Sequence, residues 1–128
     1  MSVIKKLRKL FKFYKLDGYI IPKNDEFFGE YIDDRDDRLN FISLFSGSAG
    51  HGLILKKKAY LFVDGRYTLQ AKKETNKNFK IIEIHKTKPS EIIAKINQKL
   101  RIGFDPKLFS EAFLINNFKT KNTTLIPI

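Results

Sequence analysis

The sequence alternates short apolar runs with segments in which apolar residues recur every three or four positions. Apolar runs of about four to eight residues indicate buried β-strands, whereas the three-and-four spacing is typical of helices that bury one face. The expected strands span residues 19–22, 52–55, 59–63, 79–84, 101–104 and 123–127. The expected helices span residues 2–15, 38–45, 66–75, 89–100 and 107–119. This alternation predicts a mixed α/β sheet covered by helices.

Three of the boundaries carry turn or capping signals. Asp17-Gly18 predicts the end of the first helix, and Lys56-Lys57-Lys58 predicts a tight turn that joins two strands into a hairpin. Asp105-Pro106 predicts the cap and the first turn of the last helix. With 128 residues, the chain has the size of one domain.

An irregular, acidic stretch at residues 24–37 interrupts the pattern and holds half of the chain's 14 acidic residues. Its carboxylates permit a weak divalent-cation site, but the ligand offsets and the turn glycine of a Ca²⁺ loop are absent from the sequence. A solvated face, or a surface that pairs with the basic first helix, is the preferred interpretation.

Composition excludes several classes of site and partner. The chain has no cysteine, which excludes disulfides, thiol catalysis and Cys-ligated zinc or iron–sulfur sites. Its 25 Lys and Arg give a net charge of +11, but no nucleic-acid recognition motif accompanies them. No apolar run approaches the roughly 20 residues of a membrane span. We therefore expect neither nucleic acid nor a membrane as partner, and keep a stand-alone basic module for nucleic acid or anionic surfaces as the alternative.

The usual catalytic and phosphate-binding motifs are also absent from the sequence. His51 and His85 stand without a nucleophile and an acid at motif spacing, so they are interpreted as structural or solvated residues. A loop of small residues lacks the Lys-Ser/Thr pair of a phosphate-binding loop and is interpreted as a sharp turn that lets a backbone or a ligand approach closely. That loop consists of Gly47, Ser48, Ala49 and Gly50.

The most informative cluster is Asp64-Gly65-Arg66-Tyr67, at a strand-to-helix junction. Ends of strands are where α/β proteins present functional side chains. Asp64 is expected to cap the helix, Gly65 to supply an unusual backbone dihedral and Tyr67 to pack in the core. Arg66 has two interpretations of equal weight. Its guanidinium either holds a carboxylate or carbonyl across a cleft, or forms a salt bridge to Asp64 or to the acidic stretch.

Several motifs of the chain share one ordered pattern. They are Tyr19-Ile20-Ile21-Pro22, Glu30-Tyr31-Ile32, Arg38, residues 45–50 and residues 64–71. In this order and spacing they resemble the N-terminal domain of Xaa-Pro aminopeptidases, within the creatinase/prolidase superfamily. Residues 103–106 and 125–127 look like the fifth and last strands of that domain. The resemblance implies one domain over residues 1–128, with a mixed, mostly parallel sheet of about six strands, helices on both faces and a ribonuclease-H-like fold.

The resemblance further implies a cytoplasmic parent enzyme that removes the N-terminal residue preceding proline. In such enzymes a pair of metal ions, typically Mn²⁺, activates water in a C-terminal pita-bread domain that is absent here. No metal ligand or cofactor is therefore assigned to this chain, and the chain alone is expected to be inactive. Its implied role is to shape the substrate cleft and to support oligomerisation with its own C-terminal domains and a second subunit.

The resemblance assigns roles to residues as well. Arg66 is expected to contact the proline-containing peptide, supported by Asp64, Gly65 and Tyr67, while the loop of residues 47–50 borders the cleft. The same motifs leave a prolidase or creatinase relative as an alternative. They also imply a second, similar domain after Ile128.

Overall fold

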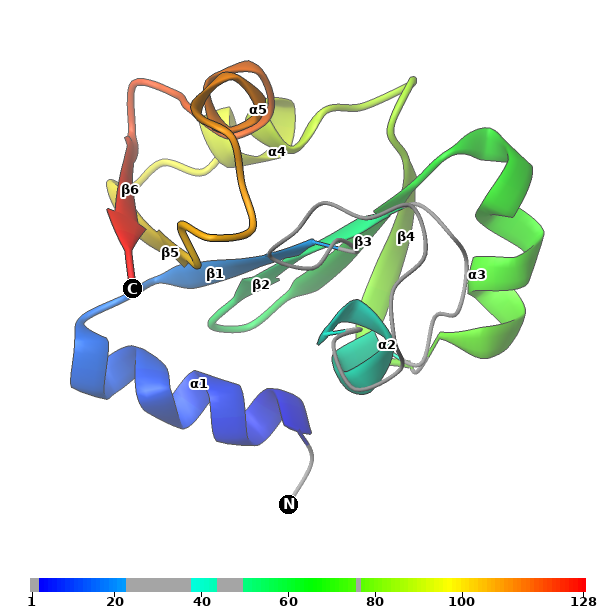
Figure 1. Ribbon diagram of the computed structural model, residues 1–128, viewed down its shortest axis with the longest axis horizontal. Helices are drawn as coiled ribbons and strands as arrows, with labels where there is room; N and C mark the ends of the chain where they lie inside the picture. The colour runs from blue at the N-terminus through cyan, green and yellow to red at the C-terminus, as the bar shows by residue number, and fades with distance from the viewer. Residues whose placement is uncertain (1–2, 23–37, 44–49, 76) are drawn as a thin grey trace.

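A computed structural model describes residues 3–22, 38–43, 50–75 and 77–128 (Figure 1). Its strands are β1 (Gly18–Pro22), β2 (His51–Leu55), β3 (Ala59–Val63), β4 (Phe79–Glu83), β5 (Leu100–Phe104) and β6 (Thr123–Pro127). Its helices are α1 (Val3–Tyr14), α2 (Arg38–Ser43), α3 (Thr68–Glu74), α4 (Pro89–Ala94) and α5 (Glu111–Asn117), with one 3₁₀ turn, η2 (Gly65–Tyr67). The acidic stretch of residues 24–37 and loop residues 47–49 lie outside the described residues.

The six strands form one mixed sheet in the order β4-β3-β2-β1-β5-β6. The β2–β3 hairpin turns at residues 56–58, as expected, and β1 pairs antiparallel with β2. The pairs β1/β5, β3/β4 and β5/β6 are parallel. Parallel pairings therefore outnumber antiparallel ones, which confirms the expected mixed, mostly parallel sheet.

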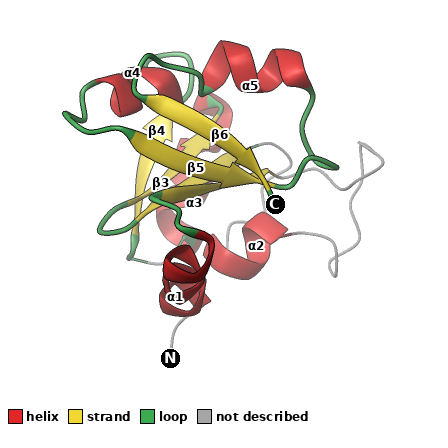
Figure 2. Cartoon of the chain, turned by 90° about the vertical axis from the view of Figure 1, so that its left-hand side faces the viewer, coloured by secondary structure: helices red, strands yellow, loops and turns green. Residues whose placement is uncertain are grey.

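Helices cover both faces of the sheet (Figures 1 and 2). On one face, α1, α2 and α3 contribute Phe11, Leu39 and Ala71 to a buried cluster. On the other, α4 and α5 contribute Ile93 and Leu114 to a second cluster. Successive residues of β3 point alternately into the two clusters, because side chains of a strand alternate between its faces. All five residues of β3 are therefore buried.

The first helix ends differently from the expectation. α1 stops at Tyr14, and Lys15 adopts a left-handed backbone with a φ of 56°. The N–H of Leu16 then donates to the carbonyl of Phe11 at 2.8 Å, which is the hydrogen bond of a Schellman cap. Gly18, expected to end the helix, lies instead inside β1, where a Cβ would stand 2.7 Å from Leu55 Cδ2. Close packing against the neighbouring strand requires that glycine.

The helices α3, α4 and α5 are also shorter than their sequence patterns predict. α3 begins at Thr68, because Arg66 and Tyr67 belong to η2. α4 ends at Ala94, and Leu100, expected on its apolar face, is the first residue of β5. The side-chain amide of Asn122 donates to the carbonyls of Ile93, Ile96 and Gln98 at 3.0 Å each, which holds the chain in a loop after α4.

The last helix, α5, begins after a different cap from the expected one. Its N-cap is Ser110, whose hydroxyl accepts from the N–H of Phe113. Asp105 accepts from the N–H of Lys107 in a separate turn. None of the described helices is long and apolar enough to cross a bilayer.

His51 lies in the core, at the start of β2. Only 5% of it is exposed, and its ring lies 5.3 to 5.6 Å from the rings of Phe62, Phe113 and Phe118. Its Nε2 has no hydrogen-bond partner among the described residues. Burial without such a partner penalises the imidazolium, so it lowers the pKa of His51 to about 4. His51 therefore serves as a neutral aromatic ring in the core.

Lys15→Gly is expected to stabilise the fold. Glycine adopts the left-handed conformation without the Cβ clash, so the free energy of unfolding rises by about 1 kcal/mol in urea titrations. Lys12→Gly is the matched control. Lys12 is an exposed helical residue of the same turn, and its replacement by glycine lowers the free energy of unfolding by about 1 kcal/mol. Destabilisation by both variants would contradict the proposed cap.

The burial of His51 makes stability depend on pH. Its folded-state pKa of about 4 lies below the unfolded value of 6.5, so protons bind the unfolded chain more readily. Its contribution is complete above pH 6.5 and is lost as the pH falls towards 4, by about 3 kcal/mol. His51→Phe removes this pH-dependent contribution to the free energy of unfolding. We therefore expect the variant's urea midpoint to fall less than the wild-type midpoint between pH 7 and pH 4. Parallel pH profiles would show that His51 is not buried in neutral form.

Candidate functional site

The cluster Asp64-Gly65-Arg66-Tyr67 lies at one edge of the sheet. Asp64 directly follows β3, and the next three residues form η2. Because β3 and β4 run parallel, His85, two residues beyond the end of β4, reaches the same edge. Gly50 lies there too, since it precedes β2 and His51 pairs with Phe62 near the end of β3. The fold thus brings together residues from three separate segments.

The carboxylate of Asp64 organises this edge. Its Oδ1 accepts from the backbone N–H of Arg66 at 2.9 Å and from Arg66 Nε at 3.2 Å. Its Oδ2 lies 3.5 Å from Nε2 of His85. The hydrogen bond from the Arg66 backbone is the main cause of a lowered pKa of Asp64, and that from the guanidinium is the next. Asp64 therefore caps η2, as expected, and orients the side chain of Arg66.

Of the two interpretations of Arg66 that the sequence left open, the structure shows the salt bridge to Asp64. Its Nε pairs with Asp64, while the side chain as a whole stays 77% exposed. Its Cζ lies 5.6 Å from the centre of the Tyr67 ring, a cation–π distance, and Tyr67 packs against the core beneath. Among the described residues, the two terminal nitrogens of the guanidinium have no acceptor. This end of the side chain is free to bind a carboxylate or a carbonyl.

Gly65 does not have the unusual dihedral that the sequence suggested. Its backbone belongs to the 3₁₀ turn, and its φ is not positive. A Cβ there would lie 2.5 Å from a carboxylate oxygen of Glu83. The flexible side chain of Glu83, which also pairs with Lys86 at 3.4 Å, is the group that would have to shift to make room for a larger residue.

The structure places the remaining candidates in different ways. His51 is a core residue, and Gly50 is half-buried at the sheet edge. His85, interpreted from the sequence as solvated or structural, is exposed but contacts Asp64. Only the parallel pairing of β3 with β4 brings these two together, and no local motif signals it. Within the part of the chain that the structure describes, no three carboxylate or imidazole groups converge to hold a metal ion, so these residues do not fit a metal centre.

Comparison with known proteins shows the family. The Creatinase/Prolidase N-terminal domain matches residues 4–128. The chain is 35% identical to a probable Xaa-Pro aminopeptidase P of Coprinopsis cinerea, over 94% of this chain and 21% of that protein. It is 37% identical to Xaa-Pro aminopeptidase 1 of Dictyostelium discoideum, over 86% of this chain and 18% of that protein. The chain thus spans about a fifth of the length of these relatives.

A solved structure agrees with the sequence relatives. The X-prolyl aminopeptidase of Caenorhabditis elegans, described as a cytosolic enzyme with a di-nuclear active site, superimposes with a TM-score of 0.82 and 27% identity. The similarity covers 98% of this chain and 23% of that one. The sheet order, the helices on both faces and the match over residues 4–128 lead to one conclusion: the chain belongs to the creatinase/prolidase N-terminal domain family.

Proposed function

We propose that this chain is the non-catalytic N-terminal domain of an Xaa-Pro aminopeptidase, a metallopeptidase that removes the N-terminal residue preceding proline. The observation that carries the proposal is the exposed guanidinium of Arg66, held by Asp64 at a sheet edge, in a chain whose relatives at 35% and 37% identity are named Xaa-Pro aminopeptidases. These names favour an aminopeptidase over the prolidase and creatinase alternatives.

In this proposal, Arg66 extends from the domain into the substrate cleft. A guanidinium whose terminal nitrogens are free forms paired hydrogen bonds with a peptide carboxylate or carbonyl. Asp64 and Tyr67 support it, the first by pairing with Nε and the second by lying beneath the charge. Gly65 supports it by its place in η2. The loop of residues 47–50 borders the same cleft, which the position of Gly50 at this sheet edge supports.

The reacting groups belong to the rest of the parent protein in this proposal. A pair of Mn²⁺ ions there would supply a nucleophilic water. The di-nuclear active site named for the nematode enzyme supports this division, as does the lack of a metal-binding cluster among the described residues. The domain would shape access to the cleft, while its own C-terminal domains and a second subunit are its partners. The nematode enzyme's description as cytosolic supports a cytoplasmic location.

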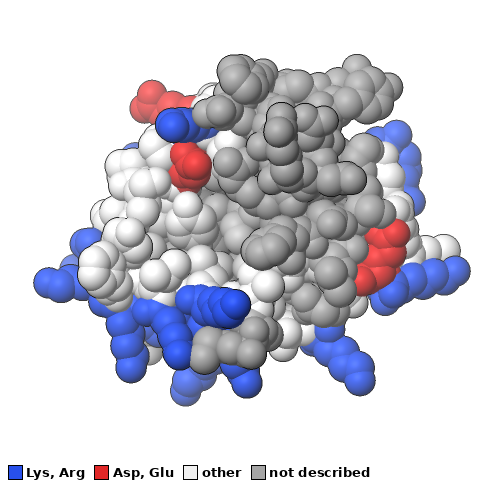
Figure 3. Space-filling view, turned by 60° about the horizontal axis from the view of Figure 1, so that its bottom comes forward, with Lys and Arg blue, Asp and Glu red and all other residues white. Residues whose placement is uncertain are grey.

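The net charge of +11 does not favour nucleic acid or a membrane as partner. Figure 3 shows Lys and Arg side chains projecting mainly along the lower border of this face and also from its two sides. Every arginine whose side chain is described, however, donates to an oxygen of the protein itself. Arg8 donates to the carbonyl of Leu55, Arg101 to that of Lys15 and Arg66 to the carboxylate of Asp64. We therefore propose that the excess charge keeps the domain soluble and does not form a recognition surface for nucleic acid or for a membrane.

The purified 128-residue chain is expected to have no peptidase activity. An Xaa-Pro peptide incubated with the chain, with or without added Mn²⁺, releases no N-terminal residue above the buffer control, because the proposal assigns the groups that activate water to the rest of the parent protein. Chromatography of the free amino acid provides the measurement. Metal-dependent release that follows the chain through gel filtration would overturn the assigned division between domains.

Replacement of Arg66 in the complete parent enzyme tests the substrate contact. Arg66→Ala is expected to lower kcat/KM for an Xaa-Pro peptide about tenfold to a hundredfold, the usual cost of losing a hydrogen bond to a charged group. Arg66→Lys restores only part of the loss, because it keeps the charge without the planar fork.

Lys72→Ala is the matched control, since Lys72 is an exposed cation on the adjacent helix α3. It leaves kcat/KM unchanged. Circular dichroism and thermal unfolding check that each variant keeps its fold. Wild-type kinetics in Arg66→Ala would remove Arg66 from the substrate cleft.

A further inference from the structure

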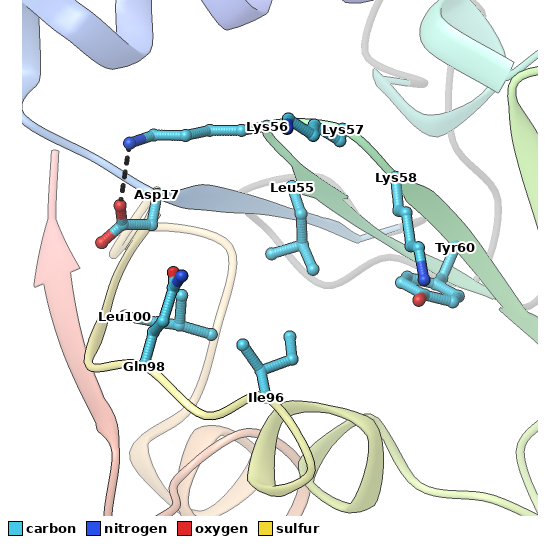
Figure 4. A pocket seen from close by; sticks show the side chains of 9 residues that line it. All are labelled: Asp17, Leu55, Lys56, Lys57, Lys58, Tyr60, Ile96, Gln98 and Leu100. Atoms are coloured by element: carbon cyan, nitrogen blue, oxygen red, sulfur yellow. Dashed lines mark ion pairs between the residues drawn. The ribbon is translucent and has the colours of Figure 1, made fainter.

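A hollow lies at the opposite end of β3 from Arg66. It opens between the turn of the β2–β3 hairpin and the loop that leads from α4 into β5, and its volume is about 440 Å³ (Figure 4). Pockets that bind small molecules have volumes of roughly 300 to 1,000 Å³. We call this hollow the hairpin groove. None of the residues assigned to the substrate cleft lines it.

The floor of the hairpin groove is apolar. Leu55 of β2 and Leu100 of β5 point into it from the sheet, and Ile96 points into it from the loop after α4 (Figure 4). The ring of Tyr60 forms one end. Leu55, Leu100 and Tyr60 are themselves largely buried, so the floor belongs to the rigid core. A ligand lying here would lose apolar surface to side chains that do not need to move.

The rim of the hairpin groove carries positive charge. Three consecutive lysines of the hairpin turn line it, against a single carboxylate, that of Asp17. Asp17 already pairs with the amino group of Lys56 at 3.1 Å. Lys57 and Lys58 are exposed and have no carboxylate partner among the described residues, and Figure 4 shows the amino group of Lys58 beside the ring of Tyr60. The unpaired positive charge at this end attracts an anion.

Both walls of the groove are fixed by hydrogen bonds. On the loop wall, the amide of Asn122 donates to the carbonyls of Ile96 and Gln98 at 3.0 Å each. On the hairpin wall, the N–H of Leu55 donates to the carbonyl of Lys58 at 2.8 Å. Asp17 links the two walls, because its carboxylate also accepts from the N–H of Arg101 at 2.8 Å. A site with preformed walls costs little ordering when a ligand binds.

We propose that the hairpin groove binds a small organic anion with an apolar body, of the class of medium-chain and aromatic carboxylates. The apolar body lies on Leu55, Ile96 and Leu100. The carboxylate lies at the Tyr60 end, next to the amino group of Lys58. The neutral pair of Asp17 and Lys56 closes the other end, beside the side-chain amide of Gln98.

Octanoate is the probe that tests the proposal, titrated into the isotopically labelled chain and followed by NMR chemical shifts. The shifts are expected to concentrate on the residues that line the groove and to saturate with a dissociation constant of about 1 mM, reasonable for a ligand of this size. Acetate, which lacks the apolar body, and octylammonium, which reverses the charge, should produce no saturating shifts there.

Matched variants separate the groove from general surface binding. Lys58→Gln should weaken octanoate about two- to fivefold, as expected for one exposed charge pair, whereas Lys72→Gln on α3 removes an equally exposed charge without effect. Ile96→Ser should weaken octanoate as well. Its control is Leu69→Ser, since Leu69 is an apolar side chain that is 73% exposed outside the groove.

Three results would overturn the proposal. They are octanoate shifts that concentrate outside the groove, equal binding of octylammonium, and equal losses in the Lys58 and Lys72 variants. Because Lys58→Gln changes only an exposed side chain, a folded variant is expected for the decisive measurement. The proposal does not depend on the peptidase assignment, since octanoate binding needs only this chain.

Discussion

The pairing of β1 with β2 on one side and β5 on the other holds the domain together. β1 joins the antiparallel hairpin to the parallel β5–β6 pair, and among the described strands no other pair hydrogen-bonds the two halves of the sheet to each other. The strands approach so closely that a Cβ on Gly18 would lie 3.0 Å from the carbonyl oxygen of Ile54. Asp17, the residue before it, exchanges hydrogen bonds with the backbone of Arg101. These contacts set the register that places both the Arg66 edge and the hairpin groove.

The strands were predictable because they are short apolar runs of four to six residues bounded by turn signals, a pattern that indicates a buried strand. Each observed strand overlaps its expected range. The ends of the helices were less predictable, since they depend on contacts distant in sequence. Asn122, which ends the α4 segment, lies 26 residues from Ile96 and 29 from Ile93. At α1, Lys15 takes the left-handed position that glycine usually holds. The nearest glycine is Gly18, so the sequence pattern predicts the end of the helix there.

The contacts of the candidate sites also divide into those that a local motif predicts and those that depend on segments distant in the sequence. Asp64 and Arg66 interact across two residues, so their pairing follows from a local motif. The contact of Asp64 with His85 requires that β3 and β4 be parallel neighbours, which no spacing in the sequence states. The hairpin groove was missed for a related reason. Its walls come from segments around Leu55, Ile96 and Asp17 that are brought together only by the completed sheet.

The exposure of Arg66 fits a domain that lends a charge to chemistry performed elsewhere. A solvated pair such as Arg66–Asp64 is worth little on its own, because water screens it and both side chains retain freedom. Once another surface covers the edge, water is displaced and the same guanidinium interacts more strongly with an anionic or carbonyl oxygen. Asp64 has already fixed one nitrogen, which leaves the terminal nitrogens for that oxygen. In the proposed role, the domain therefore contributes the orientation of Arg66 before another surface covers this edge, and interaction energy only afterwards.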